Sequence, residues 1–168
     1  MKSDTKNVLF LCADNCSRSL FAESILRKDG AGRFRAYSAG SLPGSAIHPL
    51  ALDILESFSY PTEDLRPKDW FLFDGDAGGH MDFVLTVCDQ AAPSRCPCWS
   101  GQPEAARWPI PDPARQGGSE VDLAAAFVKT FYEIRGHLNL FLALPFDRLD
   151  RFSLQNSLVE IHGRAKAG

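Results

Sequence analysis

Short apolar runs alternate with longer amphipathic stretches along the chain, and the two kinds of segment predict strands and helices respectively. Residues 7–12 and 83–87 are apolar without alternation, which is typical of strands buried on both faces of a sheet. Residues 34–38 predict another short strand, and one more is expected near residues 106–108. The pattern therefore predicts four strands.

Apolar residues recur every three or four positions in four other stretches, which predicts amphipathic helices. These stretches are residues 19–28, 48–58, 120–144 and 148–161. The stripe in the longest stretch is expected to be core and not a cofactor site; it consists of Leu123, Phe127, Phe131, Ile134, Leu138 and Phe141.

The remaining long segments follow neither period and are expected to be loops. Residues 62–81 predict irregular chain with one short helix around 67–73 and a surface turn or insertion at 74–79, and residues 89–118 predict a long loop region. Strands that alternate with helices imply a parallel α/β sheet with helices on both faces. With no repeat or linker visible, we expect one domain over residues 1–168.

Composition narrows the class of protein. The chain has 168 residues, of which 45% are hydrophobic and 23% charged, which is typical of a folded globular domain. A net charge of −3 argues against a nucleic-acid binder, which needs a basic face. Apolar runs fall short of the roughly 20 residues that span a membrane, and the first run is too short for a secretion signal. We expect a cytoplasmic protein without nucleic-acid or membrane partners.

Five cysteines carry the candidate chemistry. They fall in two short stretches, residues 12–16 and 88–98, and their odd number disfavours a disulfide scaffold. The plain alternative is that they fill core space. Cys12 and Cys88 each follow a predicted strand, and ligands of parallel sheets bind at the carboxyl ends of strands. If those two strands are neighbours, both thiols lie at the same edge.

The residues after the first strand predict an oxyanion-binding loop. Cys12 and Arg18 are spaced as C-x5-R at a strand–loop–helix junction, where backbone N–H groups and the helix dipole favour an anion. Arg18 adds a planar fork for two oxygens, and Ser19 can donate to the Cys12 sulfur. This positive field predicts that Cys12 is a thiolate at neutral pH. The expected oxyanion-binding residues are Ala13, Asp14, Asn15, Cys16, Ser17, Arg18 and Ser19.

These residues resemble the low-molecular-weight protein tyrosine phosphatase superfamily, and more closely the arsenate reductases built on its fold. The similarity covers nearly the whole chain, in family order; its other anchors are Tyr37-Ser38-Ala39-Gly40, His48-Pro49, Val87-Cys88-Asp89, Cys96-Pro97, Arg107-Trp108 and Pro111-Asp112-Pro113. The resemblance implies a single three-layer domain with a four-stranded parallel sheet and helices on both faces.

The resemblance also implies a general acid. Asp112 lies between two prolines, and the superfamily's acid lies in such an Asp-Pro loop. Without the resemblance, a turn aspartate is the simpler interpretation. In the phosphatases this loop continues with aromatic residues, whereas here Ala114 and Arg115 follow. That difference favours the reductase branch.

For the reductase branch the resemblance implies a thiol relay through Cys12, Cys88 and Cys96 that reduces arsenate to arsenite. Cys12 attacks arsenate, Cys88 then forms a disulfide with Cys12, and Cys96 moves that disulfide to Cys88. Thioredoxin or glutaredoxin would reduce the last disulfide. Residues 89–95 are expected to form a movable loop. The sequence leaves open which thiol donor acts, and whether Cys96 or Cys98 resolves the disulfide; we expect Cys96, with Cys98 dispensable.

A potassium ion is the one cofactor that the resemblance suggests, although none is required. Asn15, Glu23 and Ser38 match the positions that hold it in some relatives, with Asp69 a weaker match. A hydrogen-bond network that stabilises the loop is the alternative. The C-x-C spacing of Cys96 and Cys98 disfavours zinc.

Three functions remain in competition. The first is a thioredoxin-coupled arsenate reductase that acts as a monomer on arsenate or a phosphate-like oxyanion in arsenic detoxification. The second is a low-molecular-weight protein tyrosine phosphatase that hydrolyses phosphate monoesters through a phosphocysteine. The third is a non-catalytic, cysteine-rich binding domain, against which the set of Cys12, Arg18 and Asp112 argues.

Overall fold

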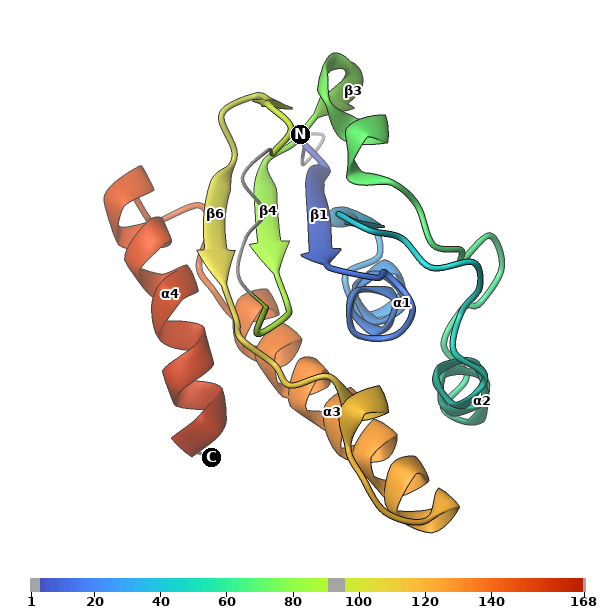
Figure 1. Cartoon of the computed structure of the whole chain (residues 1–168). Coiled ribbons are helices and arrows are strands. Elements are labelled where there is room, and N and C mark those ends of the chain that lie inside the picture. Colours follow the sequence, from blue (N-terminus) through green and yellow to red (C-terminus); the bar gives the residue numbers. More distant parts are fainter. Residues whose placement is uncertain (1–3, 91–95, 168) are drawn as a thin grey trace.

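A four-stranded parallel sheet forms the centre of the computed structural model, which describes residues 4–90 and 96–167 (Figure 1). Its strand order is β2-β1-β4-β6. The strands are β1 (Lys6–Cys12), β2 (Phe34–Gly40), β4 (Phe83–Thr86) and β6 (Glu104–Arg107). All four predicted strands and their parallel pairing are confirmed. Because β1 and β4 are neighbours, their carboxyl ends lie at the same edge of the sheet.

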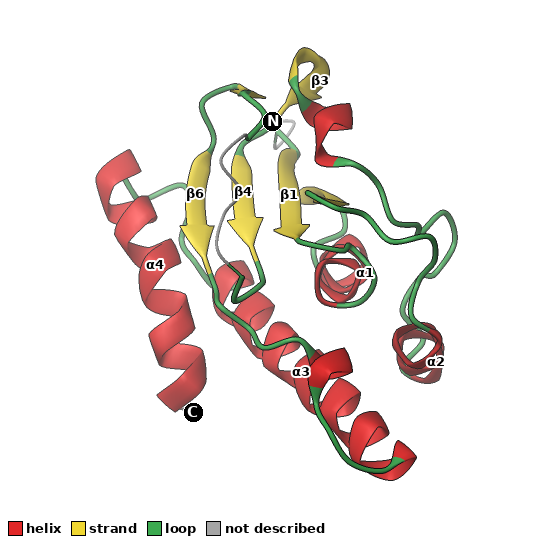
Figure 2. Cartoon of the chain, in the orientation of Figure 1, coloured by secondary structure: helices red, strands yellow, loops and turns green. Residues whose placement is uncertain are grey.

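Four α-helices complete the main elements (Figure 2). They are α1 (Arg18–Asp29), α2 (Pro49–Ser57), α3 (Glu120–Leu142) and α4 (Arg151–Ala167). His48 caps α2, since its Nδ1 accepts from the Leu50 N–H at 3.2 Å. The last helix runs six residues beyond its predicted end at residue 161, because its final turns are polar and carry no hydrophobic signal.

The two faces of the sheet are covered differently. Val8 and Phe10 belong to a large hydrophobic cluster to which all four α-helices contribute buried side chains. Leu9, Leu11 and Val84 point to the other face, which is covered by a smaller cluster around Trp70. Trp70 begins the 3-10 helix η1 (Trp70–Phe73), which covers this face together with Met81 and Trp99.

A small second sheet corrects the prediction for residues 74–79. The structure places there the strand β3 (Gly75–His80), which pairs in parallel with β5 (Trp99–Ser100). The prediction of a turn or insertion was wrong because this glycine-rich segment has no hydrophobic period of its own. Its pairing depends on a distant partner: the Gly75 N–H donates to the Cys98 carbonyl at 2.7 Å. The sequence also missed the 3-10 helix η2 (Pro113–Arg115).

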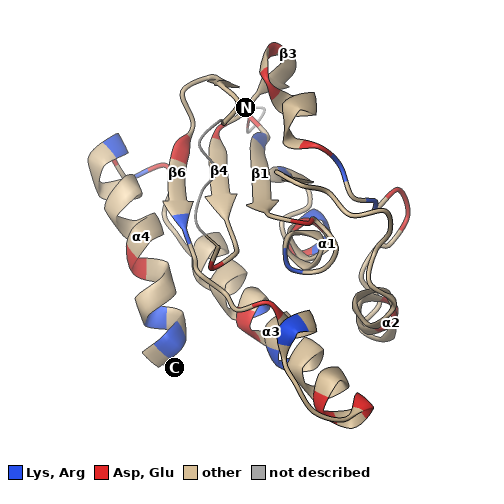
Figure 3. Cartoon of the chain, viewed as in Figure 1, with Lys and Arg blue, Asp and Glu red and all other residues tan. Residues whose placement is uncertain are grey.

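Charged residues of both signs are interspersed over the elements in the view of Figure 3. In the described part of the chain, every helix is too short or too polar to cross a membrane.

Candidate active site

The loop between β1 and α1 is hydrogen-bonded to a second loop, which follows β2. The carbonyl groups of Ala13, Asp14 and Cys16 accept hydrogen bonds from backbone N–H groups of residues 42, 44 and 48, at 2.9 to 3.0 Å. With these carbonyls bound to the second loop, the Asn15 N–H points to the inside of the loop, where it donates to Cys12 Sγ. Ser17 is the N-cap of α1, and its side chain makes no capping hydrogen bond, so the helix start keeps donors for an anion.

Two backbone positions make this loop possible. Asn15 has a φ of +52°, a left-handed conformation that asparagine tolerates better than most residues. Gly40, at the end of β2, lies so close that a Cβ there would be 2.5 Å from the Ala13 carbonyl oxygen. A side chain at position 40 would therefore displace the loop backbone.

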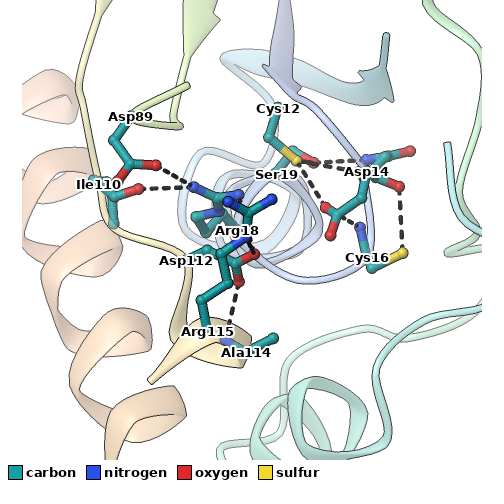
Figure 4. Close-up of polar contacts among 11 residues, drawn as sticks. Cys12, Asp14, Cys16, Arg18, Ser19, Asp89, Ile110, Asp112, Ala114 and Arg115 are labelled. Carbon is teal, nitrogen blue, oxygen red and sulfur yellow. Dashed lines mark hydrogen bonds and ion pairs between the residues drawn. The ribbon is translucent and has the colours of Figure 1, made fainter. Parts of the chain in front are cut away.

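The Cys12 thiol is at the centre of this loop (Figure 4). Its Sγ accepts from the Asn15 N–H at 3.2 Å and lies 2.9 Å from the Ser19 Oγ, while the Asp14 carboxylate is 3.7 Å away. The Asn15 amide donates to the same Ser19 Oγ at 2.6 Å. With that acceptor site filled, the Ser19 hydroxyl is free to donate to the sulfur, as the sequence predicted.

The predicted charge of Cys12 is wrong for this structure. Burial raises the pKa of the Cys12 thiol to about 11, and the Asp14 carboxylate raises it as well, against lowering by Ser19 and Arg18. The side chain is only 3% exposed, so desolvation outweighs the positive field that the sequence argument relied on. Cys12 is therefore a thiol at neutral pH in this arrangement.

Arg18 is fully buried and only partly satisfied (Figure 4). Its Nη1 donates to the Ile110 carbonyl at 2.9 Å and to the Asp89 carboxylate at 3.2 Å, and its Nη2 lies 3.8 Å from Asp112 Oδ2. Its Nε and Nη2 have no hydrogen-bond partner among the described residues. Two adjacent, buried donors without hydrogen-bond partners have the geometry of a fork that can bind two oxygens of a tetrahedral anion.

Asp112 lies beside this fork, where the sequence predicted an acid. It precedes η2, and its Oδ1 accepts from the Ala114 N–H at 2.9 Å, which fixes the carboxylate. Its Oδ2 is also 3.6 Å from Arg115 Nε, and the side chain is only 10% exposed. The geometry thus brings together Cys12, Arg18 and Asp112.

Of the three cysteines after β4, one is buried and two are exposed to solvent. Cys88 is buried with Cys12 in the large cluster, two residues beyond the end of β4, whereas Cys96 and Cys98 are exposed. Cys96 lines a cavity of about 410 Å3 that Cys12 also lines. Of the predicted movable loop, residues 91–95 lie outside the described part.

Cys16 anchors the loop in this structure. Its N–H donates to Asp14 Oδ1 at 3.2 Å and its Sγ to the Asp14 carbonyl at 3.3 Å. A Cβ at Gly44 would lie 2.5 Å from the Cys16 Sγ, so the side chain fills the space against that glycine. Burial raises the pKa of the Cys16 thiol, which suits a packing role.

The residues expected to hold potassium form a hydrogen-bond network that already contains a cation. Asn15 Nδ2 donates to Ser38 Oγ at 3.0 Å, and Ser38 Oγ donates to Glu23. The Lys68 ammonium is 3.6 Å from Glu23 Oε2, and Arg27 Nη2 is 2.8 Å from Glu23 Oε1.

These contacts do not fit a potassium ion. The Lys68 N–H also occupies Asn15 Oδ1 at 2.8 Å, so the oxygens that would bind the ion already have partners. Asp69 caps η1 by accepting from the Phe71 N–H at 2.8 Å. Within the part of the chain that the structure describes, no three His, Cys, Asp or Glu side chains gather as a metal site.

The sequence did not predict the roles of three charged residues near the site. Asp14 places a negative charge within the loop, Asp89 pairs with Arg18, and the Lys68 ammonium lies beside Glu23. Asp89 lies 71 residues from Arg18, so a local pattern carries no signal for the pair. Asp14 could have been found, because an acidic residue within an anion-binding loop is at odds with the predicted chemistry.

Known proteins with similar sequences and folds share this architecture. The chain is 28% identical over 138 residues to an arsenate reductase of Bacillus subtilis, covering 82% of this chain and 96% of that protein. A Corynebacterium glutamicum thioredoxin-dependent arsenate reductase superposes with a TM-score of 0.59 at 26% identity, covering 88% of this chain and 66% of that one. A low-molecular-weight protein tyrosine phosphatase of T. tengcongensis has the same fold, with a TM-score of 0.64, 22% identity, and coverage of 83% and 100%.

The match that decides the family spans both the loop of Cys12 and the acid loop of Asp112. Residues 7–151 match the family of low molecular weight phosphotyrosine protein phosphatases. The chain therefore belongs to the low-molecular-weight phosphotyrosine protein phosphatase family.

Proposed function

We propose that this protein is an arsenate reductase that works through a relay of cysteine thiols. The observation that carries the proposal is the buried Arg18 fork near Cys12 at the start of α1, whose Nε and Nη2 have no hydrogen-bond partner among the described residues. A tetrahedral oxyanion satisfies these donors and places its central atom next to a nucleophile.

The first step joins Cys12 to arsenic. Because the pKa of Cys12 is about 11, the thiol gives up its proton as it attacks, and an oxygen of the dianionic substrate is the base that receives it. Asp112, near Arg18 Nη2, protonates the departing oxygen, which leaves as water. The product is an arsenic(V) ester of Cys12.

The next steps carry the electrons. Cys88 attacks the Cys12 sulfur, the sulfur–arsenic bond breaks, and arsenic takes the electron pair and leaves as arsenite. Cys96 then attacks Cys88, which forms a Cys88–Cys96 disulfide and restores the Cys12 thiol. A dithiol protein of the thioredoxin or glutaredoxin type returns two electrons. The burial of Cys88 with Cys12, and the cavity lined by both Cys96 and Cys12, support a relay among these three cysteines.

Two observations favour reduction over hydrolysis of phosphate monoesters. Hydrolysis needs one cysteine, whereas here Cys88 and Cys96 accompany the nucleophile. The acid loop also continues through Ala114 and Arg115, without the aromatic residues of the phosphatase branch. The similar proteins named arsenate reductases agree with this choice.

The test compares two serine variants in two assays. Cys12→Ser is expected to abolish both arsenite formation and hydrolysis of p-nitrophenyl phosphate, since both begin at this sulfur. Cys88→Ser is expected to abolish arsenite formation while it retains any hydrolysis of the ester, which needs no second thiol. Arsenate turnover by Cys88→Ser at the wild-type rate would show that the relay does not operate.

A further inference from the structure

Cys96 and Cys98 form an exposed pair of thiols with only Pro97 between them. The backbone of Cys98 is held on both sides: its N–H donates to Asp74 Oδ1 at 2.7 Å, and its carbonyl accepts from the Gly75 N–H at 2.7 Å. Cys98 is therefore anchored to the ribbon of β3 and β5. Cys96, two residues earlier, lines the cavity beside Cys12. The pair thus connects that cavity with the outer surface.

The two thiols are close enough to affect each other. Burial raises the pKa of the Cys96 thiol, and the charges of Cys98 and then Asp74 raise it further. The single residue Pro97 between them also limits how far apart the two thiols can move. A thiol tethered in this way has a far higher effective concentration than any thiol in solution.

An external thiol can reach Cys96 and Cys98 more easily than Cys88. Cys88 is 5% exposed, so a disulfide that includes it has one sulfur within the hydrophobic core. Exposed disulfides are the ones that exchange readily with an external thiolate. Moving the bond from Cys88 to Cys98 would place both of its sulfurs at the surface.

We propose that Cys98 is a fourth thiol of the relay and that the oxidised protein ends as a Cys96–Cys98 disulfide. The Cys98 thiolate attacks the Cys96 sulfur, the Cys88–Cys96 bond breaks, and Cys88 leaves as a thiolate that takes up the proton from Cys98. No electrons enter or leave, because arsenate has already been reduced. This inference rests on the proposed function and replaces the expectation that Cys98 is dispensable.

Disulfide mapping after a single turnover tests this step. The fully reduced protein receives one equivalent of arsenate without a reductant, is quenched with acid and alkylated, and its peptides are mapped. The wild type is expected to contain the Cys96–Cys98 bridge. Cys98→Ser is expected to form the same amount of arsenite but to stop at Cys88–Cys96, and thioredoxin should reduce it about tenfold more slowly.

A control in the same ribbon separates the thiol from its scaffold. Ser100→Ala removes the contact of Ser100 Oγ with Asp76 and leaves both cysteines, so it should retain the Cys96–Cys98 bridge. A wild type that accumulates Cys88–Cys96 instead, or a Cys98→Ser variant that thioredoxin recycles at the wild-type rate, would overturn the assignment.

Failure of the proposed function would look different. If the wild type forms no arsenite, the relay itself is wrong. The cysteine pair is then judged by oxidising the reduced protein with diamide: a Cys96–Cys98 bridge supports a surface redox pair, and other pairings exclude it.

Discussion

Burial is the main reason why Cys12 holds its proton, and the neighbouring Asp14 carboxylate adds to the effect. Asp14 also accepts a hydrogen bond within the loop that is proposed to bind the substrate. Its Oδ1 accepts from the Cys16 N–H, one of the donors expected to bind the oxyanion. A single residue thus raises the pKa of Cys12 and occupies one donor of the proposed anion site.

Replacing Asp14 with asparagine should therefore improve the free site. We expect Asp14→Asn to lower the pKa of Cys12 below about 11 and to lower the KM for arsenate. Removal of a like charge near the anion is worth about 1 kcal/mol, or roughly fivefold in KM. The rate of alkylation by iodoacetamide against pH reports the pKa, and steady-state kinetics report KM. An unchanged alkylation profile together with a raised KM would contradict the assignment.

Two pairings connect elements that are distant in the sequence, one beside the site and one between α3 and α4. Lys68 precedes η1; its ammonium lies beside Glu23 of α1, and its backbone N–H donates to Asn15 Oδ1 in the loop. On the other side of the molecule, His137 of α3 meets His162 of α4, with the two ring nitrogens 2.9 Å apart. Each contact ties together segments far apart in sequence.

The internal ammonium predicts that potassium has no specific effect on the wild type. Lys68→Met should remove the ammonium beside Glu23 Oε2, so that potassium chloride raises its Tm more than tetramethylammonium chloride at equal ionic strength. Lys129→Met, an exposed lysine on α3, is the matched control and should respond like the wild type. A wild type stabilised by potassium as strongly as the variant would show that the ion binds beside Lys68.

The histidine pair makes the docking of α4 sensitive to pH. His137 Nδ1 donates to the Glu133 carbonyl, so its neutral Nε2 accepts from His162 Nδ1–H. Burial lowers the pKa of both histidines; the Lys166 ammonium lowers each further, and the Glu133 carboxylate opposes this.

The direction in which stability changes with pH follows from the number of protons that the folded and unfolded states bind. Lowered folded-state pKa values mean that the unfolded chain binds more protons, so stability falls as pH drops below about 6.5. We expect a lower urea midpoint at pH 5.5 than at pH 8. His162→Asn keeps a donor at the position of Nδ1 but cannot be protonated, so its decline should be smaller. An equal decline in both proteins would assign the pH effect to other groups.

At the scale of the whole molecule, the site joins two segments that are far apart in the sequence: the junction of β1 and α1, and the chain after β6. The end of β1 supplies Cys12, the start of α1 supplies Arg18, and the chain after β6 supplies Ile110 and Asp112. An oxyanion that bridges these segments binds the folded state only, and it should therefore stabilise the entire domain.

Phosphate is the simplest probe of that linkage. At 100 times its dissociation constant it should add about 2.7 kcal/mol to the free energy of unfolding, and so raise the Tm by several degrees. Arg18→Lys keeps the charge but loses the planar fork, so most of this shift should vanish. Chloride at matched ionic strength is the control. An equal rise in Tm with chloride, or in Arg18→Lys, would exclude the oxyanion site.

The sequence alone determined the four strands, the four helices, the loop from Cys12 to Ser19 and the placement of Cys12 and Cys88 at strand ends. These features depend on hydrophobic periods and on residues close in the chain. Tertiary structure decided what lies next to that loop: Asp89 on Arg18, Lys68 beside Glu23, and the pairing of β3 with β5. It also reversed the expected charge state of Cys12, because a pKa depends on how much water the fold removes from the thiol. A local pattern specifies which donors surround a sulfur, whereas burial and long-range charge are properties of the packed chain.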